Sequence, residues 1–277
     1  MKKIYLLPNV ITAFGLSCGL FVIFRMNMTE VGDVTEQVLI ATAWILILAA
    51  FADLLDGAVA RAMHAESDFG ILFDSLSDAI TFGVAPSVVI LKTLSIQPGT
   101  ESSFLMTAGA MVYTICGVLR LIRYNLTIPA SIGTPEILPA DKKNFTGLPI
   151  PAAAGAMISL NLFLFHPEFI DINPQYRTFI LFAALIVVGY FMICRWRFPG
   201  IKALKVRVTS FRMVFITVLG AVFIFYGVFH HFPLFFFLTC WLYIVVALSL
   251  SFIRITTGKK SKTLEDFEPE PEDPEDL

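Results

Sequence analysis

Four aspartates that could hold a metal ion lie close together in the sequence, within an otherwise apolar part of the chain. They are Asp53, Asp56, Asp74 and Asp78. Largely apolar segments flank them at residues 42–52 and 79–94. Spacings of three and four residues place the two members of each pair on one face of a helix. The sequence therefore predicts two helices that each present a pair of carboxylates.

The two carboxylate faces meet if the helices form a hairpin. Residues 63–67 provide a short turn, and Ser67 or Asp68 can cap the start of the second helix. Each aspartate of the first helix then lies level with one of the second, roughly 10 to 15 Å from the turn at about 1.5 Å per residue. The level pairs are Asp53 with Asp78, and Asp56 with Asp74.

Carboxylates at this distance cannot all stay ionised unless a cation neutralises them. Ligands that are all oxygen select a hard ion, Mg²⁺ or Mn²⁺, and two such ions sharing the cluster suit a displacement at phosphorus. The alternative is that these aspartates are helix caps or solvated groups. That alternative suits a single aspartate, whereas four on facing stripes favour a metal site.

The run from Asp53 to Asp78 resembles the signature of the CDP-alcohol phosphatidyltransferase family, D-x2-D-G-x2-A-R-x8-G-x3-D-x3-D, at every fixed position. The resemblance implies an enzyme with two metal ions that cleaves the pyrophosphate of a CDP-linked lipid and releases CMP. Three further runs, at residues 73–86, 119–125 and 145–152, resemble the phosphatidylserine synthase branch. That branch implies CDP-diacylglycerol and L-serine as substrates.

The resemblance also implies roles for individual residues. The metal ligands would be Asp53, Asp56 and Asp74, and Asp78 could join them. Asp78 would also act as general base on the serine hydroxyl, whose high pKa calls for one. The CDP-lipid would be bound by Asn9, Thr12, Gly57, Ala60, Arg61, Ser67 and Gly70. The acceptor would be bound by Arg120, Arg123 and Asn125, because a guanidinium matches a carboxylate in a bidentate fork.

Two other functions remain open at this point. The acceptor could instead be glycerol 3-phosphate, choline or inositol, with the same chemistry at the pyrophosphate. A protein of another class, a cation or proton transporter, also carries carboxylates within the membrane. A transporter does not need the glycine, alanine and arginine spacing of the motif, and it usually shows internal repeats, of which we detect none.

The composition indicates an all-α polytopic membrane bundle. The chain is 57% hydrophobic, only 15% charged, and holds 27 phenylalanines, far above the usage of soluble proteins. We expect eight transmembrane helices and a location in the cell membrane. Their ranges are 9–25, 37–63, 68–93, 103–124, 149–165, 178–194, 210–229 and 233–253.

The basic residues predict the orientation. With the N-terminus in the cytoplasm, 3 of the 20 lysines and arginines, Arg25, Lys92 and Arg177, fall outside. The positive-inside rule then puts both termini and the carboxylate hairpin in the cytoplasm. We expect residues 1–256 to form the transmembrane domain and residues 257–277 a disordered acidic tail. We further expect a homodimer with a basic face toward membrane lipid, and no nucleic-acid partner.

Overall fold

The computed structural model describes residues 6–30, 32–63, 67–94, 96, 99–127, 145–166, 173–194, 197–198, 227 and 230–257. It divides the chain into two compact units. The first contains residues 1–137 and 148–194, and the second contains residues 138–147 and 195–277. The expected tail begins at residue 257 and lies almost wholly outside the described residues, so its disorder stays a prediction.

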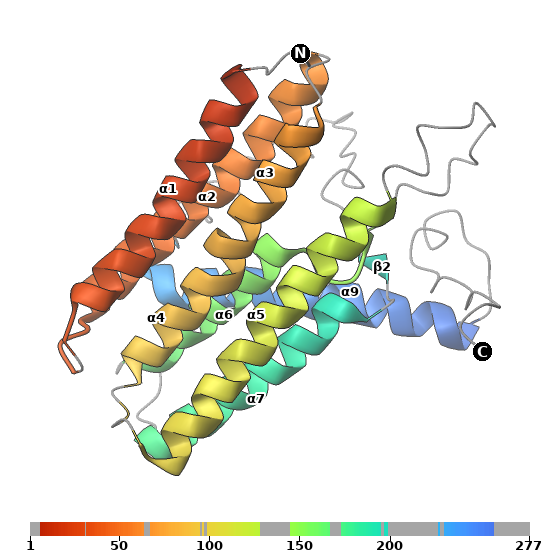
Figure 1. Cartoon of the computed structure of the whole chain (residues 1–277). Helices are drawn as coiled ribbons and strands as arrows, with labels where there is room; N and C mark the ends of the chain where they lie inside the picture. Colours follow the sequence, from red (N-terminus) through yellow and green to blue (C-terminus); the bar gives the residue numbers. More distant parts are fainter. Residues whose placement is uncertain are drawn as a thin grey trace. The chain divides into compact units, whose positions relative to one another are not determined.

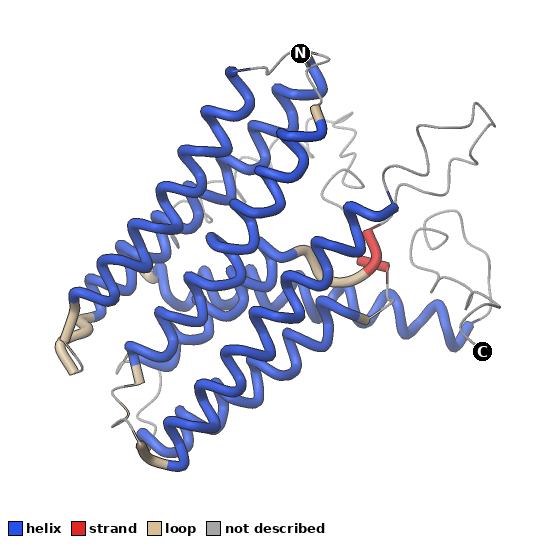
Figure 2. The backbone as a smooth tube through the Cα atoms, in the orientation of Figure 1, coloured by secondary structure: helices blue, strands red, loops and turns tan. Residues whose placement is uncertain are grey.

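The first unit is a bundle of helices (Figures 1 and 2). Its elements are α1 (Leu6–Met28), α2 (Glu36–Ala62), α3 (Asp68–Asp78), the π-helix η1 (Ala79–Val84), α4 (Ala85–Thr93), α5 (Glu101–Thr127), α6 (Ile150–Phe165) and α7 (Pro174–Ile193). Helix α1 packs along α2, and the first part of the α3–η1–α4 segment packs against α1 as well. Helix α5 packs along α7. The carboxylate hairpin therefore belongs to the layer formed by α1, α2 and α3.

The second unit contains one short antiparallel ladder and one long helix. Strands β1 (Phe145–Thr146) and β2 (Arg197–Phe198) pair with each other, and α9 spans Phe232–Thr257. The described residues are thus almost entirely helical, as the sequence predicts. Seven of the eight expected helices are present, and the expected helix at 210–229 lies outside the described residues.

Polar caps begin the helices where the sequence supplies them. The Ser67 side chain accepts a hydrogen bond from the Gly70 N–H at 3.1 Å and caps α3, which confirms the predicted start of the second hairpin helix. Thr35 caps α2 in the same way, through the Val38 N–H. These caps satisfy N–H groups that a first helical turn leaves without partners.

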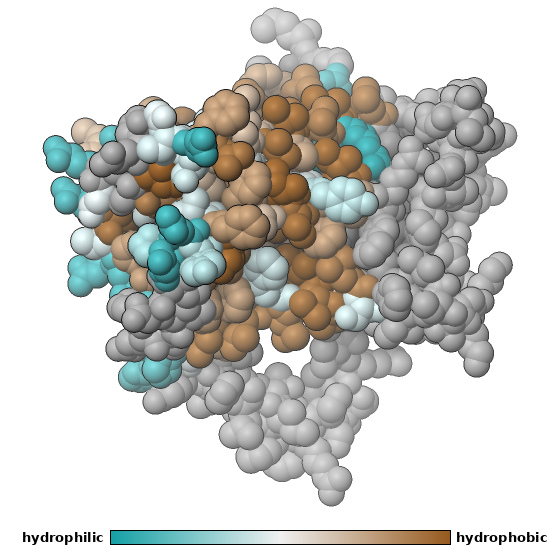
Figure 3. All heavy atoms as spheres, turned by 90° about the horizontal axis from the view of Figure 1, so that it is seen from below, coloured by the Kyte–Doolittle hydropathy of each residue, from teal (hydrophilic) through white to brown (hydrophobic). Residues whose placement is uncertain are grey.

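Six helices are long and apolar enough to cross a membrane. They cover residues 6–28, 36–62, 68–93, 101–126, 174–193 and 232–249. Helix α6 is apolar but has only 16 residues, short of the roughly 20 that a spanning helix needs. Large apolar side chains lie exposed on the helices, for example Phe104 at 76% and Phe24 at 61%, and Figure 3 shows such residues gathered over much of one face. The count of eight spans stays a prediction.

Helix α1 approaches the third segment closely because it carries a glycine at the contact. A Cβ placed on Gly19 would lie 2.8 Å from the Cα of Thr81, closer than real Cβ atoms come to a backbone. Ser77 adds a hydrogen bond across the same interface, to the carbonyl of Thr12 at 3.4 Å. This close packing makes α1 one wall of the carboxylate pocket.

Candidate active site

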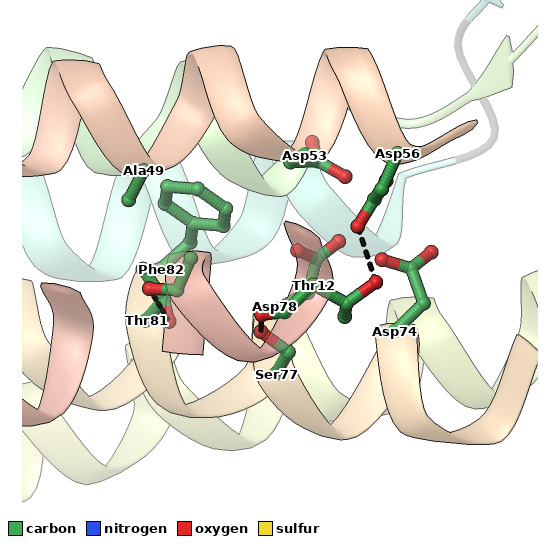
Figure 4. A pocket seen from close by; sticks show the side chains of 10 residues that line it. Thr12, Ala49, Asp53, Asp56, Asp74, Ser77, Asp78, Thr81 and Phe82 are labelled. Carbon is green, nitrogen blue, oxygen red and sulfur yellow. Dashed lines mark hydrogen bonds between the residues drawn. The ribbon is translucent and has the colours of Figure 1, made fainter. Parts of the chain in front are cut away.

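All four aspartates of the motif line one small pocket in the first unit (Figure 4). Its walls come from α1, α2, α3 and η1. The lining residues are Thr12, Gly15, Ala49, Asp53, Asp56, Asp74, Ser77, Asp78, Thr81 and Phe82. The cavity volume is about 10 Å³, close to the minimum that one ordered water molecule needs. The pocket is therefore the size of a site for small ions or water.

Three of the aspartates form a tight cluster. Asp53 and Asp56 from α2 and Asp74 from α3 each offer a carboxylate oxygen, and these oxygens lie within 4.8 Å of one another. Asp56 is 4% exposed. Asp78 lines the same pocket one helical turn further along. The predicted meeting of the two carboxylate faces is thus confirmed, with Asp78 at the rim of a three-carboxylate cluster.

A threonine on α1 fixes the most buried carboxylate. The Thr12 hydroxyl donates to Oδ2 of Asp56 at 2.5 Å, and its oxygen also lies 3.1 Å from the Pro8 carbonyl (Figure 4). A hydroxyl has one proton, so these two acceptors compete for it. When the proton points to Asp56, that carboxylate is oriented toward the other two.

The cluster fits a divalent metal ion. Carboxylate and hydroxyl oxygens are the ligands that hard cations take, and three mutually repelling carboxylates within 4.8 Å call for a cation between them. The three aspartates could therefore hold a metal ion, and Asp78 is close enough in the pocket to belong to the same site.

The residues expected to bind the CDP-lipid lie at one end of the same helices, beyond the carboxylates. Gly70 lies beside Asn9 of α1, because a Cβ on Gly70 would be 3.3 Å from Asn9 Oδ1. The Asn9 Nδ2 group is buried and makes no hydrogen bond within the described part of the chain. Arg61 folds back along its own helix, with Nη1 3.4 Å from where a Gly57 Cβ would stand.

The residues expected to bind the acceptor lie near the end of α5, but they point to different partners. Asn125 Nδ2 donates to Ser75 Oγ on α3 at 2.8 Å. Arg123 Nη1 donates to the carbonyl of Ile193 at the end of α7, at 3.4 Å. The positive charge of Arg120 interacts with the carboxylates of Asp53 and Asp78.

Two pocket residues escaped the sequence analysis. Ser77 and Thr81 both line the pocket. Each follows a motif aspartate by three residues, Asp74 and Asp78 respectively, so each belongs to the same helical face. That spacing was the signal that could have found them.

Comparison with known proteins identifies the family to which this pocket belongs. A family-wide model of the CDP-alcohol phosphatidyltransferases matches residues 5–196, about two thirds of the chain. This chain belongs to the CDP-alcohol phosphatidyltransferase family. The match covers α1 to α7 and the whole carboxylate pocket, so the family's shared region coincides with the described site.

Several named members of this family resemble the chain over most of its length. A CDP-diacylglycerol–serine O-phosphatidyltransferase of Helicobacter pylori is 30% identical over 216 residues, 78% of this chain and 81% of the relative. One of Bacillus subtilis is 29% identical over 200 residues, 71% of this chain and 91% of the relative. An archaetidylserine synthase of Methanothermobacter thermautotrophicus is 36% identical over 133 residues, 46% and 49% of the two chains.

Proposed function

We propose that this phosphatidyltransferase transfers the phosphatidyl group of CDP-diacylglycerol to the hydroxyl of L-serine, giving phosphatidylserine and CMP. The observation that carries the proposal is the three-carboxylate cluster, with Asp78 beside it, in one pocket of a chain related to enzymes named for this reaction. A cation transporter is disfavoured because family membership covers the very residues that it would use.

The metal site is proposed to hold two Mg²⁺ or Mn²⁺ ions. Asp53, Asp56 and Asp74 would hold them, with Asp78 able to join. The bound ions would supply charge stabilisation at the pyrophosphate, where negative charge builds up during displacement. The Thr12 hydroxyl would keep Asp56 turned toward the cluster, as its hydrogen bond suggests.

Asp78 is proposed to be the general base. The serine hydroxyl oxygen would form a bond to the phosphorus that carries the diacylglycerol. The bond from that phosphorus to the bridging oxygen would break, and the oxygen would leave as part of CMP. The hydroxyl proton would pass to Asp78, which lines the pocket without belonging to the three-carboxylate cluster and so has an oxygen to spare for it.

The CDP-lipid is proposed to lie along the α1, α2 and α3 ends next to the pocket. Arg61 would bind the pyrophosphate through its guanidinium, and Gly57 and Gly70 would leave room for the nucleotide. The buried Asn9 Nδ2 group would donate to the nucleotide. Thr12, Ala60 and Ser67 would complete this surface.

The acceptor is proposed to bind between α5 and the pocket. Arg120 would pair with the serine carboxylate. Asn125 holds α3 through its Nδ2, and its Oδ1 is buried and accepts no hydrogen bond in the described part of the chain. That oxygen would accept from the serine ammonium. Arg123 would lie further out and attract the carboxylate by its charge.

The topology and assembly are also proposed at this finer level. We infer that eight helices span the cell membrane, that both termini and the pocket face the cytoplasm, and that the enzyme is a homodimer. The described helices support a multi-pass membrane protein. A cytoplasmic site would meet CDP-diacylglycerol in the inner leaflet and serine in solution.

A direct assay tests the reaction. Purified protein is mixed with CDP-diacylglycerol and labelled L-serine, and labelled phosphatidylserine and CMP are measured. We expect equal amounts of both, loss of activity with a chelator, and recovery with Mg²⁺ or Mn²⁺. Release of CMP with glycerol 3-phosphate, inositol or choline but not with serine would overturn the choice of acceptor. No CMP with any of these alcohols would overturn the transferase assignment.

A further inference from the structure

The turn that follows Asp78 is wider than an α-helical turn. In η1 (Ala79–Val84) the helix opens to the π form, and at its end the Ala85 N–H donates to the carbonyl of Ile80, five residues back instead of four. Such a turn inserts one extra residue into a helix, and π-turns of this kind occur frequently at functional sites. Here the turn begins directly after the last aspartate of the motif.

Pro86 leaves a gap in the backbone hydrogen bonds at this turn. Proline has no N–H, so Pro86 cannot donate to the carbonyl of Phe82, four residues before it. A buried carbonyl that lacks a partner is costly, and Phe82 is only 2% exposed. The widened turn therefore needs a donor from outside its own helix.

Helix α5 supplies donors to two successive carbonyls of the turn. The hydroxyl of Tyr113 donates to the Phe82 carbonyl at 3.0 Å, and the hydroxyl of Thr114 donates to the Gly83 carbonyl at 3.1 Å. The Gly83 carbonyl has a second hydroxyl within reach, since Ser87 also donates to it at 3.2 Å. Tyr113 is 0% exposed, so water cannot take its place.

The extra residue in η1 changes which faces the two halves of the segment present. In a helix of 3.6 residues per turn, one inserted residue rotates the following part by about 100° relative to the preceding part. Before the turn, Asp74 and Asp78 face the pocket. After it, Ser87 faces α5, where its hydroxyl lies 3.4 Å from the Ala110 carbonyl and 3.1 Å from Thr114 Oγ1. Closing the turn with α4 held in place would swing both aspartates away.

We propose that Tyr113 is a positioning residue for the carboxylate site: its hydroxyl replaces the N–H that Pro86 lacks, and so holds open the π-turn that aims Asp74 and Asp78 into the pocket. The role deepens the proposed function, since it governs how the metal ligands and the base are presented. Tyr113 itself touches neither the pocket lining nor the substrates.

Tyr113→Phe tests this role because it removes the hydroxyl and keeps the ring. Mn²⁺ binding to the purified protein is measured by the loss of the free-ion electron paramagnetic resonance signal, without any substrate. We expect Mn²⁺ affinity to fall by about ten- to a hundredfold, the usual effect of removing a group that orients a metal ligand. Tyr190→Phe is the matched control: it deletes the same atom from a residue that is 65% exposed on α7, and it should bind Mn²⁺ like the wild type.

Pro86→Ala approaches the same turn from the other side. Alanine restores an N–H that can donate to the Phe82 carbonyl and lets the turn close to the α form. Because alanine favours a helix over proline, this variant should melt at the same or a higher temperature and still bind Mn²⁺ more weakly. Weaker binding in a protein that is no less stable is a result that general loss of packing cannot produce.

The outcomes separate this inference from the proposed reaction. Mn²⁺ affinity like that of the wild type in folded Tyr113→Phe overturns the positioning role. If Tyr113→Phe does not fold, unchanged Mn²⁺ affinity in Pro86→Ala overturns it instead. If the wild type binds Mn²⁺ but transfers nothing to serine, the proposed function fails, whereas weaker Mn²⁺ binding in the two variants would still support the role of Tyr113.

Discussion

Asp78 differs from the other motif aspartates in that it lines the pocket outside the three-carboxylate cluster. We expect Asp78→Asn to abolish turnover, because an amide cannot accept the serine proton, while CDP-lipid binding in the presence of metal stays largely intact. Asp53→Asn and Asp74→Asn should instead weaken metal-dependent CDP-lipid binding. Turnover and CDP-diacylglycerol binding measured on all three variants check this division.

A control for this series removes a carboxylate elsewhere. Asp33 lies exposed between α1 and α2, and Asp33→Asn should leave both turnover and binding unchanged. Turnover like that of the wild type in Asp78→Asn would rule out Asp78 as the base. The four aspartates would then act only through the metal site.

Thr12 acts on the site through a single hydroxyl. Its hydrogen bond to Asp56 is charge-assisted and buried, and losing such a bond costs about 1.5 to 3 kcal/mol. We expect Thr12→Val to raise the metal concentration needed for half-maximal activity by about tenfold or more, whereas Thr12→Ser keeps the donor and should stay near the wild type. Metal titrations of the three proteins decide this, and equal curves for valine and serine would show that the hydroxyl is dispensable.

Arg120 is the cation on α5 whose charge reaches the carboxylates. L-Serine brings a carboxylate, and a guanidinium can hold it with two parallel hydrogen bonds. We expect Arg120→Ala to raise the serine KM by roughly ten- to a hundredfold, since a charge-assisted bond contributes about 1.5 to 3 kcal/mol. The affinity for CDP-diacylglycerol should change little.

Arg120→Lys provides the comparison for this prediction. A lysine keeps the charge but not the planar fork, so it should restore serine affinity only in part. Serine saturation curves at fixed CDP-diacylglycerol distinguish the three proteins. A serine KM in the alanine variant equal to that of the wild type would move recognition of the carboxylate to another residue.

At the scale of elements, the carboxylate hairpin was predictable and the π-turn was not. Helical spacing of the aspartates and the capping pattern at Ser67 depend on near neighbours in sequence, so both could be read from the chain. Pro86 predicts a break in the third helix, but a break can be a kink or an inserted residue. Which of the two occurs depends on donors from α5, such as Tyr113, about thirty residues away.

The contact between α1 and η1 gives a prediction about packing. A Cβ at position 19 would meet the Thr81 backbone at 2.8 Å, whereas a Cβ at position 15 would lie an ordinary 3.7 Å from Ala52. We expect Gly19→Ala to lower the melting temperature, because overpacking costs about 1 to 3 kcal/mol. Gly15→Ala should not lower it, since alanine favours the helix by about 1 kcal/mol. Thermal melts in detergent measure both, and equal melting temperatures would show that α1 can shift without cost.

At the scale of the first unit, the helix ends around the pocket lie on one side. Asn9 near the start of α1 lies beside Gly70 at the start of α3. Asn125 near the end of α5 bonds Ser75 of α3, and Arg123 reaches the carbonyl of Ile193 where α7 ends. The N-terminal end of α1, the hairpin turn and the C-terminal ends of α5 and α7 must therefore face the same compartment.

The charges of the described residues alone do not choose that compartment. The pocket side of the first unit carries Arg61, Arg120 and Arg123, and the opposite side carries Arg25, Lys92 and Arg177. Most of the asymmetry comes from basic residues outside the described ranges. These are Lys2, Lys3, Lys142, Lys143, Arg195, Lys202, Lys205, Arg207, Arg212, Lys259, Lys260 and Lys262.

The positive-inside rule applied to these residues predicts a cytoplasmic pocket, and reporter fusions test it. An enzyme that is active only outside the membrane, fused within the loop between α1 and α2, should be active there and silent when fused after Lys260. The loop is a strong test because it carries Glu30, Asp33 and Glu36 and no lysine or arginine between residues 29 and 35, so its side depends on the rest of the chain. Activity of the fusion after Lys260 would put an odd number of spans between the two points or reverse the chain. Activity at both sites would contradict eight spans in particular, because seven spans separate the loop from the C-terminus in that topology and place the two reporters on opposite sides.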